Sequence, residues 1–273
     1  MSVSYSPVRV FSKTVYARAY PRLVGTHRQP DWLFIEVALP LLGTIAMVFV
    51  YRALNAPPQY LGFVILGGAL MAFWQNVLWM MAVQFYWDRN MGTLEVYTAS
   101  PASLSAVLLG MALGAIPSTA LRAAVILTVG SVLFGVSYSL SGLLPALAVF
   151  ALTLAALYGL GMLLASLFLF YGRGVENIGE ALQEPVFLIT GLYFPVKALG
   201  GYVGAASSLI PLTLGLDAMR QLLLPGTPAF VPLGWEVAVL AAQVPVYAVG
   251  ARAALAAMEM RARRDGRLIT RGT

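Results

Sequence analysis

Long apolar runs separated by short polar segments dominate the pattern of this chain. Six runs are long enough to cross a membrane as helices, because a helix rises about 1.5 Å per residue and about 20 apolar residues cross the roughly 30 Å hydrocarbon layer. The pattern therefore predicts an all-α polytopic membrane protein with six transmembrane helices. We place these helices at residues 33–50, 61–85, 106–135, 143–170, 178–195 and 234–258.

The stretch over residues 197–224 is apolar enough to suggest a seventh crossing. Its composition argues otherwise, because Gly200, Gly201 and Pro211 make a poor lipid-facing helix. Irregular backbone is tolerated at membrane depth only where protein buries it. We therefore predict an outer re-entrant helical hairpin over residues 197–228, between the fifth and sixth spans.

Basic residues gather at the two ends of the chain. Lys and Arg accumulate on the cytoplasmic side of membrane proteins, so both termini are expected in the cytoplasm and the number of crossings should be even. The loops 87–103 and 171–177 then also face the cytoplasm. The basic residues of the two ends are Arg9, Lys13, Arg18, Arg22, Arg28, Arg261, Arg263, Arg264, Arg267 and Arg271.

We expect residues 1–31 to form a cytoplasmic N-terminal arm, residues 32–260 the membrane domain and residues 261–273 a basic cytoplasmic tail. The arm is predicted as an amphipathic helix on the inner membrane surface. Val8 falls on its apolar side, whereas Arg9 points elsewhere, toward anionic headgroups. A disordered basic tail and an organellar transit peptide are the alternatives.

Composition excludes several classes of protein. Apolar residues make up 60% of the 273 residues and charged residues only 10%, against about 25% charged in soluble domains. The chain has no cysteine and one histidine, which removes thiolate chemistry and two-histidine metal motifs. Lys13 and Lys197 follow Ser12 and Val196, so no Gly-Lys pair of a phosphate-binding P-loop exists. We expect no catalytic residue, no metal site, no bound cofactor and no nucleic-acid partner.

The sequence of the polar segment 87–103 favours a short helix. Gly92 permits a turn, Thr93 can cap a short helix, and the charge of Glu95 is favoured near its start. Ser100 stands before Pro101 and so ends the helix. The sequence predicts a short amphipathic helix on the inner face, with an ordinary connecting loop as the alternative.

Gly-Thr-Leu-Glu followed by Ser-Pro directly after a span resembles the loop of type-2 ABC exporter permeases. Residues 190–196 (TGLYFPV), residues 210–213 (IPLT) and Arg220 are similar to that family's fifth span, outer re-entrant helices and trailing arginine. A weaker match is residues 28–30 (RQP) with Pro40 inside the first span. The daunorubicin-type drug-resistance branch is the part of the family that the chain resembles most.

The resemblance implies a permease that pairs with a second copy or a paralogous permease in a prokaryotic inner membrane. Two separate ATPase subunits, which bind ATP and Mg, would dock beneath it and drive export of an amphipathic or hydrophobic drug, natural product, lipid or glycoconjugate. Gly200-Gly201 departs from the family pattern and leaves the shape of the hairpin open. The resemblance also implies that residues 87–103, which we call the coupling segment, contact the ATPase. The residues implied in coupling are Arg89, Gly92, Thr93, Leu94, Glu95, Ser100 and Pro101.

Three acids at a spacing of four, Glu176, Glu180 and Glu184, share one face of the fifth span. One interpretation is that these acids line the inner mouth of a translocation path, since this span borders the dimer interface in the family. The other is that Glu176 and Glu180 are solvated at the inner surface and that hydrogen bonds neutralise Glu184. The residues expected to line the path are Trp74, Glu180, Glu184, Phe187, Tyr193 and Phe194.

A gradient-driven secondary transporter that uses Glu180, Glu184 and Arg122 is the alternative function. Six spans without a detectable inverted repeat disfavour it. Arg122 either pairs with one of these glutamates or extends to an interface. Asp217 and Arg220 are one turn apart, which predicts a local ion pair. The spacing of Gly110 and Gly114 predicts close helix packing.

Overall fold

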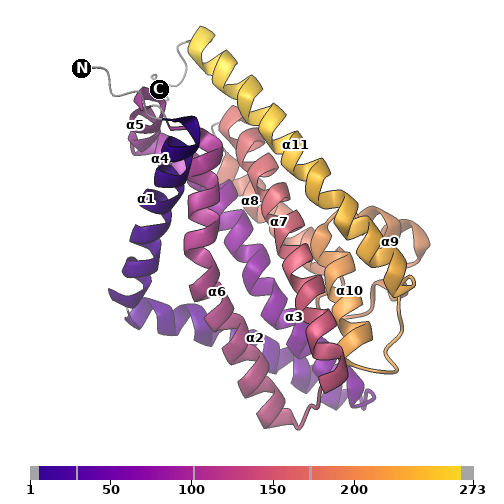
Figure 1. Cartoon of the computed structure of the whole chain (residues 1–273). Helices are drawn as coiled ribbons and strands as arrows, with labels where there is room; N and C mark the ends of the chain where they lie inside the picture. Colours follow the sequence, from indigo (N-terminus) through magenta and orange to yellow (C-terminus); the bar gives the residue numbers. More distant parts are fainter. Residues whose placement is uncertain (1–5, 29, 101, 172–173, 266–273) are drawn as a thin grey trace.

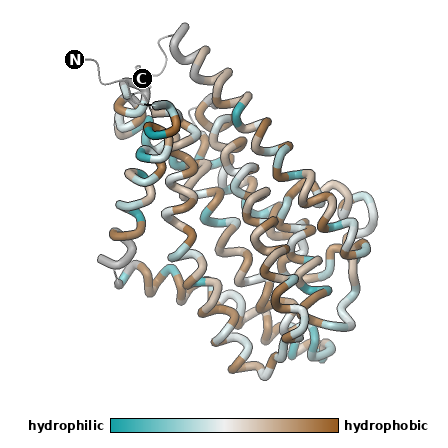
Figure 2. The backbone as a smooth tube through the Cα atoms, in the orientation of Figure 1, coloured by the Kyte–Doolittle hydropathy of each residue, from teal (hydrophilic) through white to brown (hydrophobic). Residues whose placement is uncertain are grey.

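A computed structural model describes residues 6–28, 30–100, 102–171 and 174–265, and every regular element in these ranges is helical (Figure 1). This confirms the all-α prediction. Apolar residues run along the length of the long helices (Figure 2). The helices are α1 Pro7–Arg28, α2 Pro30–Ala53, α3 Gln59–Val77, α4 Gln84–Asn90, α5 Thr93–Ala99, α6 Leu104–Phe134, α7 Leu143–Tyr171, α8 Val175–Ile189, α9 Gly201–Ser207, α10 Pro211–Leu223 and α11 Leu233–Asp265.

Five of the predicted spans are confirmed as helices long and apolar enough to cross a membrane. They cover Leu33–Ala53, Gln59–Asn90, Leu104–Phe134, Leu140–Leu169 and Leu233–Met258. The second of these is α3 continued through the π-helical turn η1 (Leu78–Ala82) into α4. It therefore forms one long rod through the bundle, and its apolar residues, from Phe63 to Phe85, lie in the core.

The fifth predicted span, residues 178–195, is a shorter helix than expected. α8 ends at Ile189 after 15 residues, a length of about 22 Å that falls short of the hydrocarbon layer. The cause is local, because Gly191 adopts a left-handed φ of 73° and the chain is extended at Pro195. The last part of the predicted span is therefore a turn.

The predicted re-entrant hairpin is present as the helix pair α9 and α10, which are bent by 109° relative to each other. The break lies at Ile210, whose backbone is extended, and Pro211 opens α10 at the helix start, where a missing N–H is harmless. The hydroxyl of Thr213 donates to the carbonyl of Ser207 across the break at 2.7 Å. Within the pair, α10 packs against α7 and α11, whereas α9 contacts α8.

The N-terminal arm is helical, so the alternative of a disordered tail is wrong for residues 7–28. α1 runs along α6, and the predicted close packing at Gly110 and Gly114 is confirmed with α1 as the partner. A Cβ atom at Gly110 would lie 2.6 Å from the Val15 carbonyl oxygen, and one at Gly114 would lie 2.7 Å from that of Ala19. The two glycines therefore let the arm approach the bundle at backbone distance.

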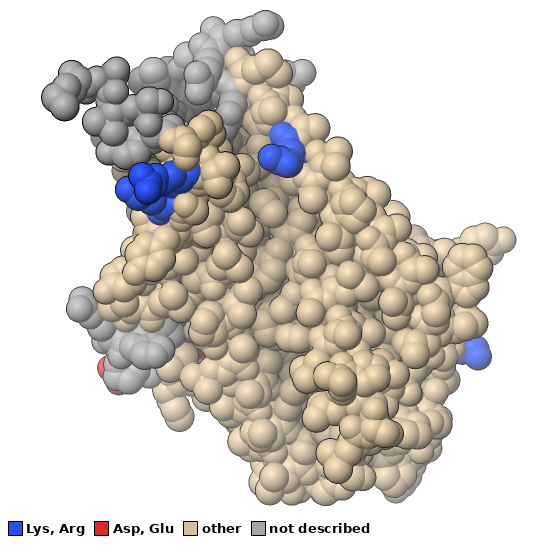
Figure 3. Space-filling model, in the orientation of Figure 1, with Lys and Arg blue, Asp and Glu red and all other residues tan. Residues whose placement is uncertain are grey.

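α1 begins and α11 ends at the same end of the bundle, where α4 and α5 also lie (Figure 1). On the face shown in Figure 3, basic side chains lie mainly toward this end, and the broad surface below them is largely uncharged. This is the distribution expected when one end of a bundle stands in water and the middle in lipid.

Candidate functional site

The coupling segment contains the predicted short helix, α5, which begins after Gly92 and ends before Ser100 because the backbone leaves the helical conformation at both residues. Gly92 has a left-handed φ of 74° and occupies the N-cap position, so Thr93 is the first helical residue rather than the predicted cap. Ser100 is extended and its hydroxyl donates to the Tyr97 carbonyl at 2.9 Å. Pro101 lies outside the described residues, as does the side chain of Glu95.

A polar network fastens α5 to the arm and to α4. Arg18 of α1 forms an ion pair with Asp88 of α4 at 3.1 Å, and its guanidinium lies 5.2 Å from the centre of the Tyr97 ring. Gln84 donates to Asp88 at 3.0 Å and accepts from Arg22 at 3.3 Å. Burial raises the pKa of the Tyr97 hydroxyl. Our sequence reasoning missed Gln84 and Asp88, because they gain their partners only when α1 packs beside α4.

The two sides of the coupling segment differ in exposure. Leu94 is buried in the core, and Arg89 at the end of α4 is half-buried. Met91 and Val96 are 76% and 65% exposed, so the side of the segment that faces away from the bundle presents apolar side chains. Neither residue was among the predicted coupling residues. That this side contacts a partner stays a prediction.

Indole hydrogen bonds join α8 to the rod formed by α3, η1 and α4. Trp79 Nε1 donates to Gln183 and Trp87 Nε1 donates to Glu176, each at 2.6 Å. Gly179 lies between these bonds, and a Cβ atom there would be 3.4 Å from the Trp79 ring. α8 therefore runs antiparallel to the rod and is fixed to it at two levels.

The opposite side of α8 is exposed, and we call it the acid face. It presents Asn177, Glu180, Glu184 and Leu188 at helical spacing. Glu176 differs from the other two acids because it accepts the bond from Trp87. The three predicted acids thus divide into one that is bonded to the rod and two on the open face.

The aromatic residues predicted for the path lie in two environments. Phe187, Tyr193 and Phe194 are half-buried around the end of α8, and the Tyr193 carbonyl accepts from the Tyr51 hydroxyl at 2.6 Å. Trp74 is 2% exposed within the core and does not reach the acid face in a single chain. The roles of all four residues in transport stay predictions.

Arg122 pairs with neither glutamate of the acid face. Its guanidinium bonds to Glu36 of α2 at 2.5 Å, which joins α6 to α2. Glu36 is a partner that our sequence reasoning did not consider. The proposed link between Arg122 and the acids of α8, on which the secondary-transporter alternative drew, is therefore absent.

Arg220 is buried and clamps the turn that follows α8. It donates to the carbonyls of Gly191, Leu192 and Phe63 at 2.6, 2.8 and 2.9 Å. The predicted ion pair with Asp217 is wrong, because the Arg220 guanidinium donates its hydrogen bonds to backbone carbonyl oxygens instead. One Asp217 oxygen instead accepts from the backbone N–H of Phe230 at 2.8 Å and from Gln221 at 3.3 Å.

Comparison with known protein families identifies the family of this chain. The family model described as ABC-2 type transporter matches residues 26–224, well over half of the chain. The chain belongs to the ABC-2 type transporter family. The match runs from the end of α1 through α10 and so includes the coupling segment, the acid face and the re-entrant pair. No curated protein sequence matches the chain.

As an ABC-2 family member, the chain is a multi-pass membrane permease subunit of an ABC transporter, and it associates with ATP-binding cassette subunits. A permease of this kind transports and does not itself catalyse. The Arg28–Pro30 match noted in the sequence falls within the matched range. Assignment to the daunorubicin-type branch stays a prediction.

Proposed function

We propose that this ABC-2 permease is half of an exporter whose translocation path forms where the acid face of α8 meets a second copy of the chain or a paralogous permease. The acid face carries the proposal. A charged side chain at mid-bilayer costs about 2.5–3.5 kcal/mol, so intramembrane acids face protein or water rather than lipid. Glu180 and Glu184 are exposed on the single chain, and a second subunit would supply that environment.

The rod offers a mechanical route from the coupling segment to the path. Residues 59–90 form one span in which η1 and the turn residue Val83 join α3 to α4, so a displacement at α4 would be passed on to α3. Trp79 and Trp87 bond this rod to α8. Closure of two separate ATPases, which would bind ATP and Mg, would push on α5 and thereby shift the acid faces of the paired subunits.

The cargo that suits this path is an amphipathic or hydrophobic molecule, such as a drug, natural product, lipid or glycoconjugate. Phe187, Tyr193 and Phe194 would provide apolar surface near the outer end of α8, beside the acids. Because α1 begins and α11 ends at the basic end of the bundle, we assign that end to the cytoplasmic side of a prokaryotic inner membrane (Figures 1 and 3).

Cysteine cross-linking tests the seam directly, because the chain has no cysteine of its own. Leu188→Cys lies on the acid face and is expected to give a cross-linked permease pair in native membranes on mild oxidation. Val246→Cys on α11 is the matched control, since Val246 is 63% exposed and Leu188 is 59% exposed. Cross-linking through Val246 without cross-linking through Leu188 would place the seam on another face and contradict the proposal.

The apolar side of the coupling segment is tested by Val96→Asp. We expect association with the ATPase subunits to weaken by about thirtyfold or more, because a charge buried in a contact core costs about 2 kcal/mol or more. Co-purification of the permease with the ATPase measures this. Leu140→Asp makes the same change in an exposed residue of η2 (Leu140–Gly142), across the bundle from α5. Equal loss in both variants, or none in Val96→Asp, would rule out the assigned contact.

A further inference from the structure

Two buried carboxyl groups lie together where α10 of the re-entrant pair meets the start of α11, away from α4 and α5 (Figure 1). Asp217 of α10 is 2% exposed, and Glu236 in the first turn of α11 is 0% exposed. The side-chain nitrogen of Gln221 donates to both, at 2.8 Å to Glu236 and at 3.3 Å to Asp217. Neither acid belongs to the coupling segment or to the acid face, so the proposed transport function leaves this pair without a role.

The hydrogen-bond donors around the pair are too few for two ionised carboxylates. The Gln221 amide has two hydrogens, but its nitrogen also reaches the Val231 carbonyl at 3.0 Å, so three acceptors compete for them. The backbone N–H groups of Phe230 and Val231 add one bond to Asp217 and one to Glu236. Glu236 Oε1 is buried and accepts no hydrogen bond from the described residues, which leaves this oxygen free to carry a hydrogen.

The charges at this junction balance when one of the two acids is neutral. Arg220 attracts Asp217 through space, although its guanidinium is bonded to three backbone carbonyls. One carboxylate and the Arg220 guanidinium together have a net charge of zero. Two carboxylates would leave one buried negative charge without a counter-charge, which is strongly unfavourable inside a protein.

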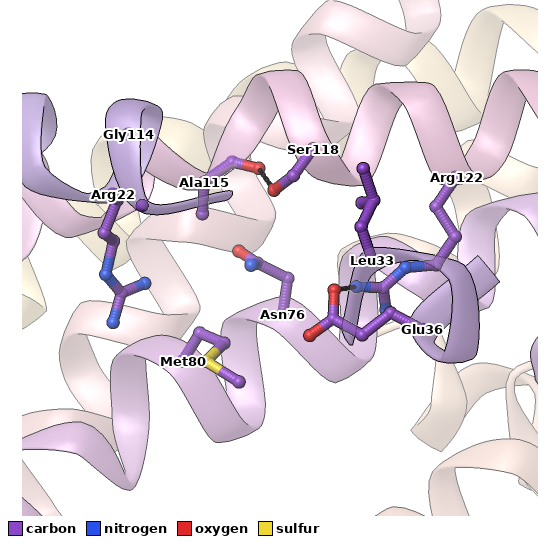
Figure 4. Close-up of a pocket in the computed structure, with 10 residues that line it drawn as sticks. Arg22, Leu33, Glu36, Asn76, Met80, Gly114, Ala115, Ser118 and Arg122 are labelled. Atoms are coloured by element: carbon purple, nitrogen blue, oxygen red, sulfur yellow. Dashed lines mark hydrogen bonds and ion pairs between the residues drawn. The ribbon is translucent and has the colours of Figure 1, made fainter. Parts of the chain in front are cut away.

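No other ionisable group on the elements packed against α10 and α11 compensates the pair. The remaining ionisable side chains of α3, α6, α7 and α11 up to Arg252, and beside η2, are Tyr60, Arg122, Tyr158, Tyr171, Tyr247, Arg252 and Tyr138. Within the described residues, no ion pair or hydrogen bond joins any of these to Asp217 or Glu236. Arg122 is bonded to Glu36 of α2 instead (Figure 4).

The two carboxyl groups are also hydrogen-bonded to each other. An ionised carboxyl group only accepts hydrogen bonds, so a bond between two of them requires a proton on one. We infer that Asp217 and Glu236 hold a single proton between them, and that this shared proton fastens the re-entrant pair to the last span, α11. The junction is thus a proton-binding site, and this inference is independent of the proposed transport function.

The shared proton makes the junction sensitive to pH. Free Asp and Glu have a pKa of about 4, so at neutral pH the unfolded chain holds no proton on these acids, whereas the folded pair holds one. Folding therefore takes up a proton, and stability falls as the pH rises. The unfolding equilibrium constant grows about tenfold per pH unit above about pH 5, until the folded pair loses its proton. That loss would place two negative charges side by side and push α10 away from α11.

Infrared spectroscopy of the full chain in nanodiscs tests the inference, because a protonated carboxyl group has a C=O stretching band that an ionised one lacks. The parent chain is expected to show this band at neutral pH. Glu236→Gln is expected to lose it, since Asp217 then has an amide donor beside it and ionises. Asp31→Asn is the matched control, because Asp31 is an exposed acid outside α10 and α11. The second readout is chemical unfolding, whose dependence on pH should weaken by about tenfold per pH unit in Glu236→Gln and persist in Asp31→Asn.

Absence of the band in the parent chain, or its survival in Glu236→Gln, would overturn the inference, as would an equal pH dependence of unfolding in these two chains. Should Glu236→Gln fail to fold, Asp217→Asn takes its place. This variant changes the hydrogen-bond partner of the protonated carboxyl group and must shift or remove the band. An unmoved band in Asp217→Asn would mean that the protonated acid lies elsewhere in the chain.

Discussion

Replacement of Arg220 by methionine is expected to lower the free energy of unfolding by about 3–5 kcal/mol and to sharply reduce the yield of folded protein. The three carbonyls that Arg220 binds, those of Gly191, Leu192 and Phe63, would lose their donor inside the bundle. Each buried polar group left without a partner costs about 1–3 kcal/mol. Part of this loss is offset because methionine removes a buried charge.

Thermal unfolding of the solubilised protein measures the effect of Arg220→Met, and Lys197→Met is the control. Lys197 also carries a positive charge in the segment between α8 and α10, but it is exposed. Surface substitutions of this kind change stability by about 0.5 kcal/mol or less. If the two variants unfold at the same temperature, the clamp has no role in holding the turn after α8.

Gly67→Ala is expected to lower the free energy of unfolding about as much as Arg220→Met does, but for a steric reason. A Cβ atom at Gly67 would lie 1.7 Å from the Leu192 carbonyl oxygen, closer than any contact can be. That oxygen also accepts from Arg220, so the turn cannot move away without breaking the clamp. Overpacking of a core costs about 1–3 kcal/mol when side chains can adjust, and here the obstacle is backbone. We expect a loss of about 3 kcal/mol.

Gly43→Ala provides the comparison for Gly67→Ala, since a Cβ atom at Gly43 of α2 would meet nothing within 4 Å. Alanine is the better helix former by about 1 kcal/mol, so Gly43→Ala should be neutral or stabilising. Unfolding temperatures of the two variants give the answer. A Gly67→Ala protein as stable as the parent would mean that α3 and the turn do not approach as closely as described.

The spans and the break between α9 and α10 could be predicted from sequence because each depends on local information. An apolar run of sufficient length specifies a crossing, and Gly200, Gly201 and Pro211 signal irregular backbone wherever they fall. The helix in the coupling segment followed from Gly92 and Ser100 for the same reason. The early end of α8 was missed because hydropathy continues past Gly191, although the backbone does not.

The polar pairings could not be predicted, because each joins helices far apart in the chain. Arg122 is 86 residues from Glu36, and Arg18 is 70 residues from Asp88. Proximity in sequence was misleading for Asp217 and Arg220, since three backbone carbonyls were better placed acceptors than the carboxylate. The indole bonds of Trp79 and Trp87 likewise needed the packing of α8 on the rod.

The packing of α1 on Gly110 and Gly114 has a consequence for biosynthesis. Val15 leaves the ribosome long before Gly110, and at about 5–20 residues per second the wait is on the order of 5 to 20 s. During that interval the surface against which the arm docks has not been made. Val8 and Phe11 stay exposed even in the docked arm, so these two side chains can contact the lipid interface before and after docking. The nascent arm would lie on the bilayer first and would pack against α6 only after this third span has inserted.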